Sequence, residues 1–366
     1  MIHELKKEKP ASITVCVPTR NRAGALHQTL LAMQRQTVPY DEMIVGDDAS
    51  EDATRETVEG LRDDRIRYVR HPRNIGLYQN WNDLIGRASG DYICIYHDHD
   101  WYLPEILQKS RQLLDQRADV AFVHTALLFV DATDSLVNAD IRPFPPVMCG
   151  ANLRRMLACD WCSPIMAATV MARRDAYRSV GPYRPDRYGL VCDKHMWFQL
   201  AQVGNVGYVA EPQALIRTRE KGRGTARFSW ANEWGALHMR EEEIAEAFAH
   251  DDAARAKAAR HLRREASTRF LTLAIRALLL EPPEAWTLEE DQVLSRLGPG
   301  ARALYLAVKY LAPVRKLVKG VALPIHYAQV AQWERTARQG ARDIAGQLGA
   351  SLPPDLPVRS VGNGNS

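Results

Sequence analysis

Two carboxylates separated by one residue, Asp98 and Asp100, follow directly after the short apolar run 92–96. An apolar run of this length is typical of a buried strand. Residues i and i+2 of an extended chain point to the same side, so the two carboxylates are expected to converge on one divalent cation. Mg²⁺ and Mn²⁺ both bind carboxylate oxygens, and Mg²⁺ usually keeps positions for substrate phosphates. The alternative is a solvated pair that ends the strand and caps the next helix.

Polar residues also follow two earlier strands of the predicted fold. Residues 19–21 come after the β-branched run 12–18, and Asp47 with Asp48 comes after the run 42–46. In open α/β sheets, ligands bind beyond the carboxyl ends of the strands. Three polar clusters at three such ends therefore predict one ligand site, although each cluster alone is equally typical of a turn or a helix cap.

The elements that must position these residues alternate between strands and helices. We predict strands at 12–18, 42–46, 65–69 and 92–96, and helices at 25–36, 53–61 and 78–88. Such alternation is typical of a parallel sheet with right-handed crossovers. We therefore expect an α/β unit whose strand ends carry the polar clusters.

Shorter elements are expected to complete this unit, and helices alone to follow it. We predict helices at 104–115, 152–158, 173–177 and 191–203, and strands at 120–123, 126–130, 167–171, 206–209 and 214–217. Further helices are expected at 230–249, 251–279, 288–297, 301–311 and 325–348. The expected organisation is one domain over residues 1–228, a helical C-terminal region over 229–352, and a disordered tail over 353–366.

Composition and charge narrow the function classes. The chain has 366 residues, of which 46% are hydrophobic and 25% charged, with a net charge of +4 and a pI near 8.7. This mild basic excess, mixed with acids along most of the chain, argues against a nucleic-acid partner. Residues 1–10 carry no apolar signal segment, and we expect a cytoplasmic protein. The single Cys159-x-x-Cys162 pair has no second Cys/His pair at zinc-site spacing, so we expect no metal or redox role there.

Five segments, in this order, carry a resemblance to a known family. They are Ile13–Arg22, Ile44–Asp52, Asn74–Gly76 continued by Asn82, His97–Trp101 followed by Pro104, and Cys192–Asp193 followed by Trp197. Together they resemble the inverting glycosyltransferases of family 2, over roughly residues 12–225. The resemblance implies the GT-A fold, a Rossmann-like nucleotide-diphospho-sugar transferase domain, followed here by the helical C-terminal region.

The resemblance also implies roles for individual residues. Asp193 is the implied general base, which accepts the proton of the acceptor hydroxyl. Asp98 and Asp100 are the implied ligands of Mn²⁺ or Mg²⁺. The implied nucleotide-binding residues lie in the remaining segments: Pro18, Thr19, Arg20, Asn21, Asp47, Asp48, Asn74, Gly76, Asp98, His99 and Arg219. Trp197 either stacks on a sugar or fills the core, and we interpret His97, His124 and His195 as structural.

The sequence departs from the family pattern at two positions. His99 stands between the two aspartates where relatives carry a carboxylate run, and in an extended chain it would point away from them. Arg219 stands where relatives often carry a histidine that helps to bind metal or pyrophosphate. An arginine balances diphosphate charge but does not ligate a cation, so dependence on metal is an open question at this point.

The expected reaction moves a sugar from a nucleotide-diphosphate donor, with a UDP-sugar as first choice. The acceptor would be a glycan or lipid-linked glycan in surface polysaccharide synthesis. Two alternatives are a nucleotidyltransferase, which the lack of glycines at 18–22 disfavours, and a nucleotide-binding scaffold on a decayed transferase domain. The basic, apolar stretch 305–319 is expected either to lie on the inner membrane face as a peripheral contact or to pack as an ordinary helix, including one between subunits of a homo-oligomer.

Overall fold

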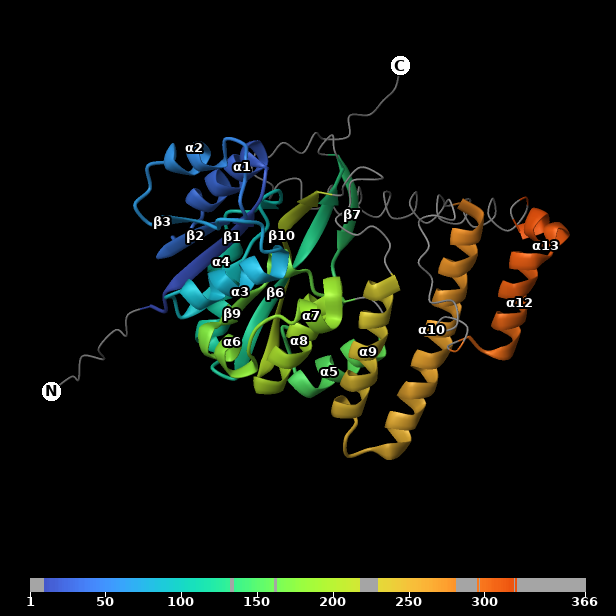
Figure 1. Ribbon diagram of the computed structural model, residues 1–366. Helices are drawn as coiled ribbons and strands as arrows, with labels where there is room; N and C mark the ends of the chain where they lie inside the picture. The colour runs from blue at the N-terminus through green and yellow to red at the C-terminus, as the bar shows by residue number, and fades with distance from the viewer. Residues whose placement is uncertain are drawn as a thin grey trace, which may run out of the picture.

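The computed structural model describes residues 10–131, 135–160, 163–217, 230–280, 295, 297–318 and 320. Its centre is one mixed sheet, with strand order β3-β2-β1-β4-β9-β6-β10-β5, in which β7 pairs with β6 and β8 with β10. Helices cover both faces of this sheet, and the C-terminal helices α9, α10 and α12 follow one another away from it (Figure 1).

The first four strands are parallel, as predicted, and helices connect them. The elements are β1 (Ile13–Thr19), α1 (Ala23–Gln34), β2 (Glu42–Asp47), α2 (Thr54–Glu59), β3 (Ile66–Arg70), α3 (Leu77–Arg87) and β4 (Tyr92–Ile95). Successive residues of β1 serve different faces, because Cys16 packs in one cluster with Leu84 of α3 and Val15 packs in another with Leu30 of α1. This alternation buries both faces of the strand and fixes where its carboxyl end lies.

The second half of the sheet differs from the prediction in how its strands are divided. It contains β5 (Trp101–Tyr102), α4 (Ile106–Gln116), β6 (Val120–Val130), β7 (Leu136–Asp140), β8 (Val147–Met148), α5 (Gly150–Cys159), η1 (Ala167–Thr169), β9 (Met171–Arg173), α6 (Arg174–Val180), α7 (Pro185–Tyr188), η2 (Gly189–Val191), α8 (Cys192–Val203) and β10 (Asn205–Arg217). The predicted pairs of short strands at 120–130 and 206–217 are wrong, since each pair is one continuous strand. His124 and Thr125 interrupt the apolar pattern of β6 but are buried within it, and Pro212 sits at a bulge of β10.

The strand predicted at 167–171 is also wrong. Residues 167–169 form a 3₁₀ turn, and the strand β9 begins only at Met171. This strand runs antiparallel between β4 and β6, where Met171 lies opposite both Cys94 and Val123. The sheet is therefore mixed, and β9 separates the four parallel strands β3, β2, β1 and β4 from a second parallel pair, β6 and β10.

The C-terminal region is helical, as predicted. It contains α9 (Trp230–Ala247), α10 (Asp252–Leu280), α12 (Pro299–Tyr310) and α13 (Ala312–Leu317). Most of the helix expected at 288–297, the helix expected at 325–348 and the tail expected at 353–366 lie outside the described residues. Within the described part of the chain, no helix combines the length and the apolar character that crossing a bilayer would take.

Helix α9 shares its core with the sheet unit. Leu237 and Ile244 belong to the same buried cluster as Leu153 of α5 and Phe198 of α8. Two buried charges accompany this packing. Arg240 donates hydrogen bonds to the Leu157 and Ala158 carbonyls, and Glu243 lies 3.2 Å from His195 Nδ1. Helix α9 is thus joined to α5 and α8 by apolar and polar contacts alike.

Candidate active site

A cleft of about 760 Å³ opens at the carboxyl ends of β1, β2 and β4 and at the start of α8. Its lining residues come from all the segments that carried the sequence motifs: Pro18, Thr19, Arg20, Arg22, Asp48, Asn74, Gly76, Leu77, Tyr78, Asn80, Trp81, His97, Asp98, His99, Asp100, Met166, Ala167, Asp193, Ile216 and Arg217. Segments almost 200 residues apart in sequence therefore meet in one place.

Most residues predicted for the site line this cleft, two do not, and one lies outside the described residues. Those that line it are Pro18, Thr19, Arg20, Asp48, Asn74, Gly76, Asp98, His99, Asp100 and Asp193. Asn21 and Asp47 are absent from its lining, and Arg219 lies outside the described residues. The position of Arg217, two residues earlier, shows that β10 delivers a cation to the cleft.

Asn21 and Asp47 support the loops that frame the cleft. Asn21 adopts a left-handed backbone conformation with φ of 53°, its amide donates to Ser50 Oγ, and its side-chain oxygen accepts from the Glu51 amide. The buried Asp47 accepts from the Ser50 amide at 2.8 Å and from the Tyr68 hydroxyl. Asn21 therefore fixes the loop after β1 to the loop after β2, and Asp47 fixes the loop after β2 to the neighbouring strand β3.

Asp48 holds the third loop. Its two carboxylate oxygens accept the backbone amides of Ile75 at 2.6 Å and Gly76 at 3.1 Å. Gly76 has φ of 91°, a conformation that costs a residue with a Cβ atom and that glycine adopts freely. The Asn-Ile-Gly segment is thus a loop that Asp48 pins to the wall of the cleft, with helix α3 starting directly after it.

Asp98 is fully engaged by its neighbours. It accepts hydrogen bonds from Thr19 Oγ1 at 2.8 Å and Arg22 Nη1 at 2.9 Å, and its Oδ1 lies 2.9 Å from His99 Nδ1. Burial pushes the pKa of the Asp98 carboxyl upward, but the bond from His99 and the charge of Arg22 outweigh burial and hold it below its ordinary value. Asp98 is therefore an anion that fixes Arg22 and His99 in place.

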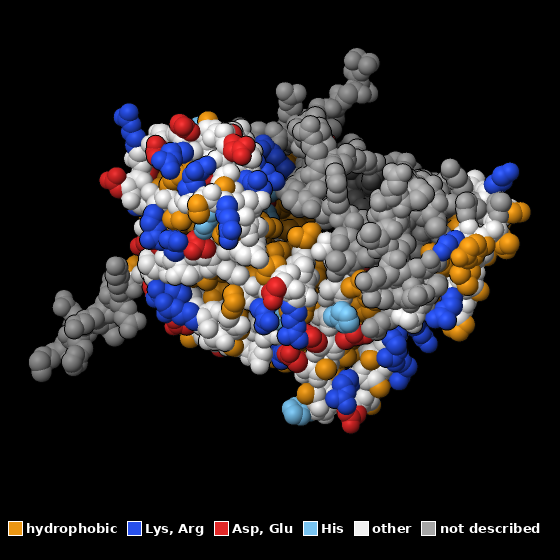
Figure 2. Space-filling model, in the orientation of Figure 1, with side chains coloured by type: hydrophobic (Ala, Val, Ile, Leu, Met, Phe, Trp, Pro, Cys, Tyr) orange, Lys and Arg blue, Asp and Glu red, His pale blue; other side chains and the backbone are white. Residues whose placement is uncertain are grey.

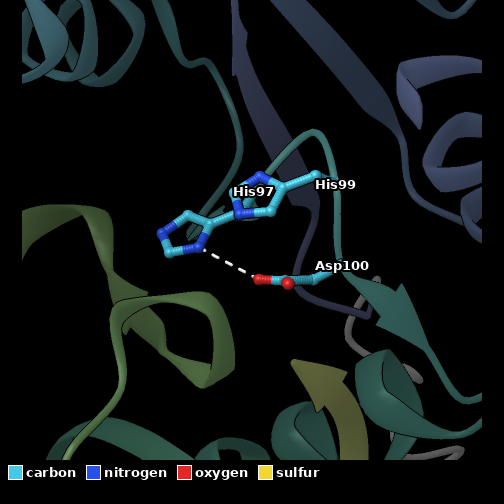
Figure 3. A group of neighbouring side chains, drawn as sticks. All are labelled: His97, His99 and Asp100. Carbon is cyan, nitrogen blue, oxygen red and sulfur yellow. Dashed lines mark hydrogen bonds and ion pairs between the residues drawn. The ribbon is translucent and has the colours of Figure 1, made fainter. Parts of the chain in front are cut away.

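A second group of potential ligand atoms lies beside Asp98. One atom each from His97, His99 and Asp100 falls within 4.8 Å of the others, and His97 Nδ1 lies 3.1 Å from Asp100 Oδ2 (Figure 3). The imidazole rings of His97 and His99 are nearly parallel, with centroids 5.7 Å apart. The chain turns at residues 98 and 99 instead of remaining extended. The expectation that His99 points away from the aspartates is therefore wrong, and His97 belongs to the site.

Asp193 lies across the cleft, in the first turn of α8. Burial raises the pKa of its carboxyl above the ordinary value, although the hydrogen bond from the Lys194 amide and the nearby His97 act in the opposite direction. The Lys194 amide donates to Asp193 Oδ1 at 2.7 Å. A half-buried carboxylate with a raised pKa is a stronger base than an exposed aspartate and suits proton abstraction.

Helix α3 holds the segment that leads to Asp193. Asn82 exchanges two hydrogen bonds with the backbone of Tyr183, at 3.0 and 2.8 Å, and the Tyr78 hydroxyl donates to the Leu190 carbonyl at 2.8 Å. The Tyr183 ring stacks on Tyr78, with centroids 5.6 Å apart. These contacts bridge about 100 residues of sequence and position the start of α8.

Replacing Asn82 with Ala is expected to slow turnover and to destabilise the protein, since it leaves the Tyr183 amide and carbonyl without their partner. The loss of these bonds should lower the free energy of unfolding by about 1–2 kcal/mol. Denaturant unfolding measures the stability, and steady-state kinetics measures kcat. Asn152→Ala, at an exposed position of α5, is the matched control. A kcat equal to that of the control would contradict a positioning role for Asn82.

Three further residues are explained by packing. Trp197 is 1% exposed and packs against Phe122 and Tyr183, so the core alternative applies to it. Burial lowers the pKa of His124 to about 3, which keeps it neutral inside β6. His195 pairs with Glu243 and faces away from the cleft lining.

Sequence reasoning missed several residues of the cleft: Arg22, Trp81, His97 and Arg217. Arg22 belongs to the segment Ile13–Arg22, and the presence of a second arginine two residues after Arg20 was the available signal. Trp81, whose ring centroid lies 5.8 Å from that of His97, gave no signal beyond helical spacing. The assembled cleft brings together guanidinium groups, a cluster of metal-ligating atoms and a carboxylate with a raised pKa. Such a site can hold a diphosphate and activate a hydroxyl.

Comparisons with known sequences agree with this chemistry. Residues 14–145 match the family described as Glycosyl transferase family 2. The GalNAc(5)-diNAcBac-PP-undecaprenol beta-1,3-glucosyltransferase of Campylobacter jejuni is 33% identical over 115 residues, which cover 31% of this chain and 36% of that protein. Abequosyltransferase RfbV of Salmonella typhimurium is 31% identical over 113 residues, which cover 30% and 34%. The chain thus aligns with about a third of the length of these relatives.

Solved structures match over most of the chain. TarS 1–349 of S. aureus, in complex with UDP-GlcNAc, superposes with a TM-score of 0.56 and 18% identity over 92% of each chain. The mannosyltransferase PcManGT of Pyrobaculum calidifontis, in complex with GDP-Man and Mn²⁺, gives a TM-score of 0.52 and 19% identity over 94% of this chain and 88% of that one. These likenesses concern the fold, and they confirm the predicted α/β transferase fold of GT-A type with its helical C-terminal region.

Proposed function

We propose that the protein, whose residues 14–145 match Glycosyl transferase family 2, transfers a sugar from a nucleoside-diphosphate sugar to an acceptor hydroxyl, with inversion at the anomeric carbon. One observation carries the proposal. Asp193, a carboxylate with a raised pKa, shares a cleft with the cations and metal-ligating side chains that suit a diphosphate. In-line displacement requires that a base and a leaving-group site be held together in one cleft.

The residues of the cleft divide the reaction between them. Asp193 would accept the proton of the acceptor hydroxyl as the new glycosidic bond forms. Arg22 and Arg217 line the side where Asp98 and Asp100 lie, and their charges would stabilise the diphosphate as it leaves. The loop that Asp48 pins, together with residues 18–20, would hold the nucleoside.

The metal-ligating side chains of the cleft suit a divalent cation. The neighbouring ligand atoms belong to two imidazoles and one carboxylate, His97, His99 and Asp100. The hydrogen bond between His99 and Asp98 is the support that metal-ligating histidines commonly have from a carboxylate. When bound there, the cation supplies charge neutralisation for the leaving diphosphate. We propose Mn²⁺ in preference to Mg²⁺, because Mg²⁺ favours oxygen ligands and accepts imidazole poorly.

The proposed classes of sugar donor and acceptor are based on the proteins to which this chain is similar. TarS is solved with UDP-GlcNAc and PcManGT with GDP-Man, so a nucleoside diphosphate sugar is the supported class and a UDP-sugar our first choice. The Campylobacter relative is named for an undecaprenol-linked substrate. We propose a glycan or lipid-linked glycan acceptor, reached from the cytoplasmic face of a membrane.

A ligand panel followed by product analysis tests the proposal. Thermal unfolding is measured with UDP, GDP, dTDP and CMP, each with and without Mn²⁺. The cognate nucleotide at a hundredfold excess over its Kd should stabilise the protein by about 2.7 kcal/mol. The matching nucleotide sugar should then give a product whose anomeric configuration, read by NMR, is opposite to that of the donor.

Each alternative has its own outcome in this panel. Release of pyrophosphate in place of a nucleoside diphosphate would identify a nucleotidyltransferase. Nucleotide binding without sugar transfer to any acceptor would favour the scaffold. Absence of any nucleotide-dependent shift would overturn the proposed function.

A further inference from the structure

The net positive charge of the chain comes from one segment of its C-terminal region. Residues 292–333 contain no Asp or Glu and six Lys or Arg: Arg296, Arg302, Lys309, Arg315, Lys316 and Lys319. These six charges exceed the net charge of +4 of the whole chain. The rest of the chain therefore carries a net negative charge, and this segment is a local source of positive potential.

The same segment exposes apolar side chains. Among the described residues, the three most exposed large hydrophobic side chains are Tyr310, Leu317 and Leu311, with exposed fractions of 69%, 63% and 53%. Leu304, in the same segment, is 44% exposed. Figure 2 shows orange side chains with interspersed blue ones at the edge where Figure 1 places α12 and α13. This patch lies on helices far from the cleft.

The helix α12 has two separate apolar faces. Tyr305 and Val308 are buried and pack toward α10. Residues 303, 304, 307, 310 and 311 follow the i, i+1, i+4, i+7, i+8 spacing of a second face, and all except the half-buried Ala307 are exposed. A helix needs only one such face to pack against its own protein. The second face therefore has no occupant within the described part of the chain.

We propose that this face of α12 and α13 binds the surface of an anionic phospholipid bilayer. Leucines and a tyrosine with lysines beside them suit the boundary between headgroups and acyl chains, where the lysine ammonium reaches the phosphates. A second copy of the chain is a poorer occupant, because a self-complementary interface would place cations opposite cations in a segment, 292–333, that contains no Asp or Glu. The face is an interfacial contact and not a span.

The inference depends on the proposed function only to explain why membrane binding would be useful: a transferase bound to the membrane surface would meet a lipid-linked acceptor there. The binding itself does not require turnover. The experiment is co-sedimentation of the full chain with vesicles of phosphatidylcholine alone and of phosphatidylcholine mixed with phosphatidylglycerol, at low and high salt. We expect binding to the mixed vesicles only, weakened by salt.

Two double variants separate the contribution of charge to vesicle binding from the contribution of apolar burial. Lys309→Gln with Lys316→Gln should weaken binding about 25-fold, at about 5-fold for each charge removed. Leu311→Ser with Leu317→Ser should weaken it by a comparable factor through lost apolar burial. The matched control, Val203→Ser with Arg178→Gln, removes an exposed apolar and an exposed basic side chain elsewhere and should bind as the unchanged protein does. Transfer to a water-soluble acceptor should stay unchanged in all three.

Three results would overturn the inference. The first is equal binding to neutral and mixed vesicles. The second is no binding to mixed vesicles at low salt. The third is a dimer in solution that the Leu311→Ser and Leu317→Ser changes dissociate, which would assign the face to a second copy. A loss of sugar transfer with intact vesicle binding would instead count against the proposed function alone.

Discussion

Asp193→Asn is expected to lower kcat by about 10²–10⁴-fold, the range that a positioned general base contributes. The amide oxygen of asparagine can still accept the hydrogen bond that the Lys194 amide donates to Asp193 Oδ1, so the start of α8 should keep its geometry. The nucleoside and diphosphate contacts come from other loops of the cleft. Nucleotide affinity should therefore remain within a few-fold of that of the unchanged protein.

The readouts are steady-state kinetics and nucleotide titration on the same preparations. Asp186→Asn, at an exposed position of α7 and seven residues earlier, is the matched control and should leave kcat unchanged. The acidic limb of the pH profile of kcat/KM should disappear in Asp193→Asn if that carboxylate accepts the proton. A variant that keeps its turnover would exclude Asp193 as the base, and a variant that loses nucleotide binding would point to misfolding.

Replacing both His97 and His99 with Ala is expected to weaken Mn²⁺ binding at least about 100-fold, because the loss of a single supporting residue already costs about 10–100-fold. The reason is the proposed ligand set, of which these residues would supply two members and Asp100 the third. Calorimetry or the Mn²⁺ electron spin resonance signal, in the presence of the cognate nucleoside diphosphate, measures the affinity without turnover. His238→Ala, at an exposed position of α9, is the control.

The identity of the cation provides a second, directional test. The unchanged protein should bind Mn²⁺ more tightly than Mg²⁺, and His99→Asp should move the preference toward Mg²⁺ by replacing an imidazole with a carboxylate. If the double alanine variant binds Mn²⁺ as the unchanged protein does, the ligands are the pair first expected from spacing, Asp98 and Asp100.

The parts of this protein that sequence predicts well are those that local pattern determines. The four parallel strands and three helices of residues 13–95 follow from apolar runs, helical spacing and turn residues, and the sheet rule then brings the strand ends together. Asp48, Asp98 and Asp193 accordingly reach one cleft. Their chemical roles remain predictions, and the family resemblance supplied most of them.

The parts that sequence reasoning misses depend on contacts between distant residues. Strand β9 enters the sheet through its pairing with β4 and β6, both of which are distant from it in sequence. The position of His97 depends on a turn at residues 98 and 99, whereas the spacing rule assumed an extended chain. Arg22 is held in position by its hydrogen bond to Asp98, which lies 76 residues away in sequence. No periodicity or propensity within a short window contains this information.

The buried charges of α9 determine where this chain can be recombined with a relative. A hybrid that joins residues 1–228 to a foreign C-terminal region would remove Arg240 and Glu243, which are 1% and 0% exposed, from their partners on α5 and α8. Their removal would leave the Leu157 and Ala158 carbonyls and the His195 ring without these hydrogen bonds, and an unsatisfied buried polar group typically costs about 1–3 kcal/mol. The crossover point should therefore follow residue 247, so that α9 travels with the sheet unit, and an exchange of α12 and α13 alone would then test the proposed membrane contact.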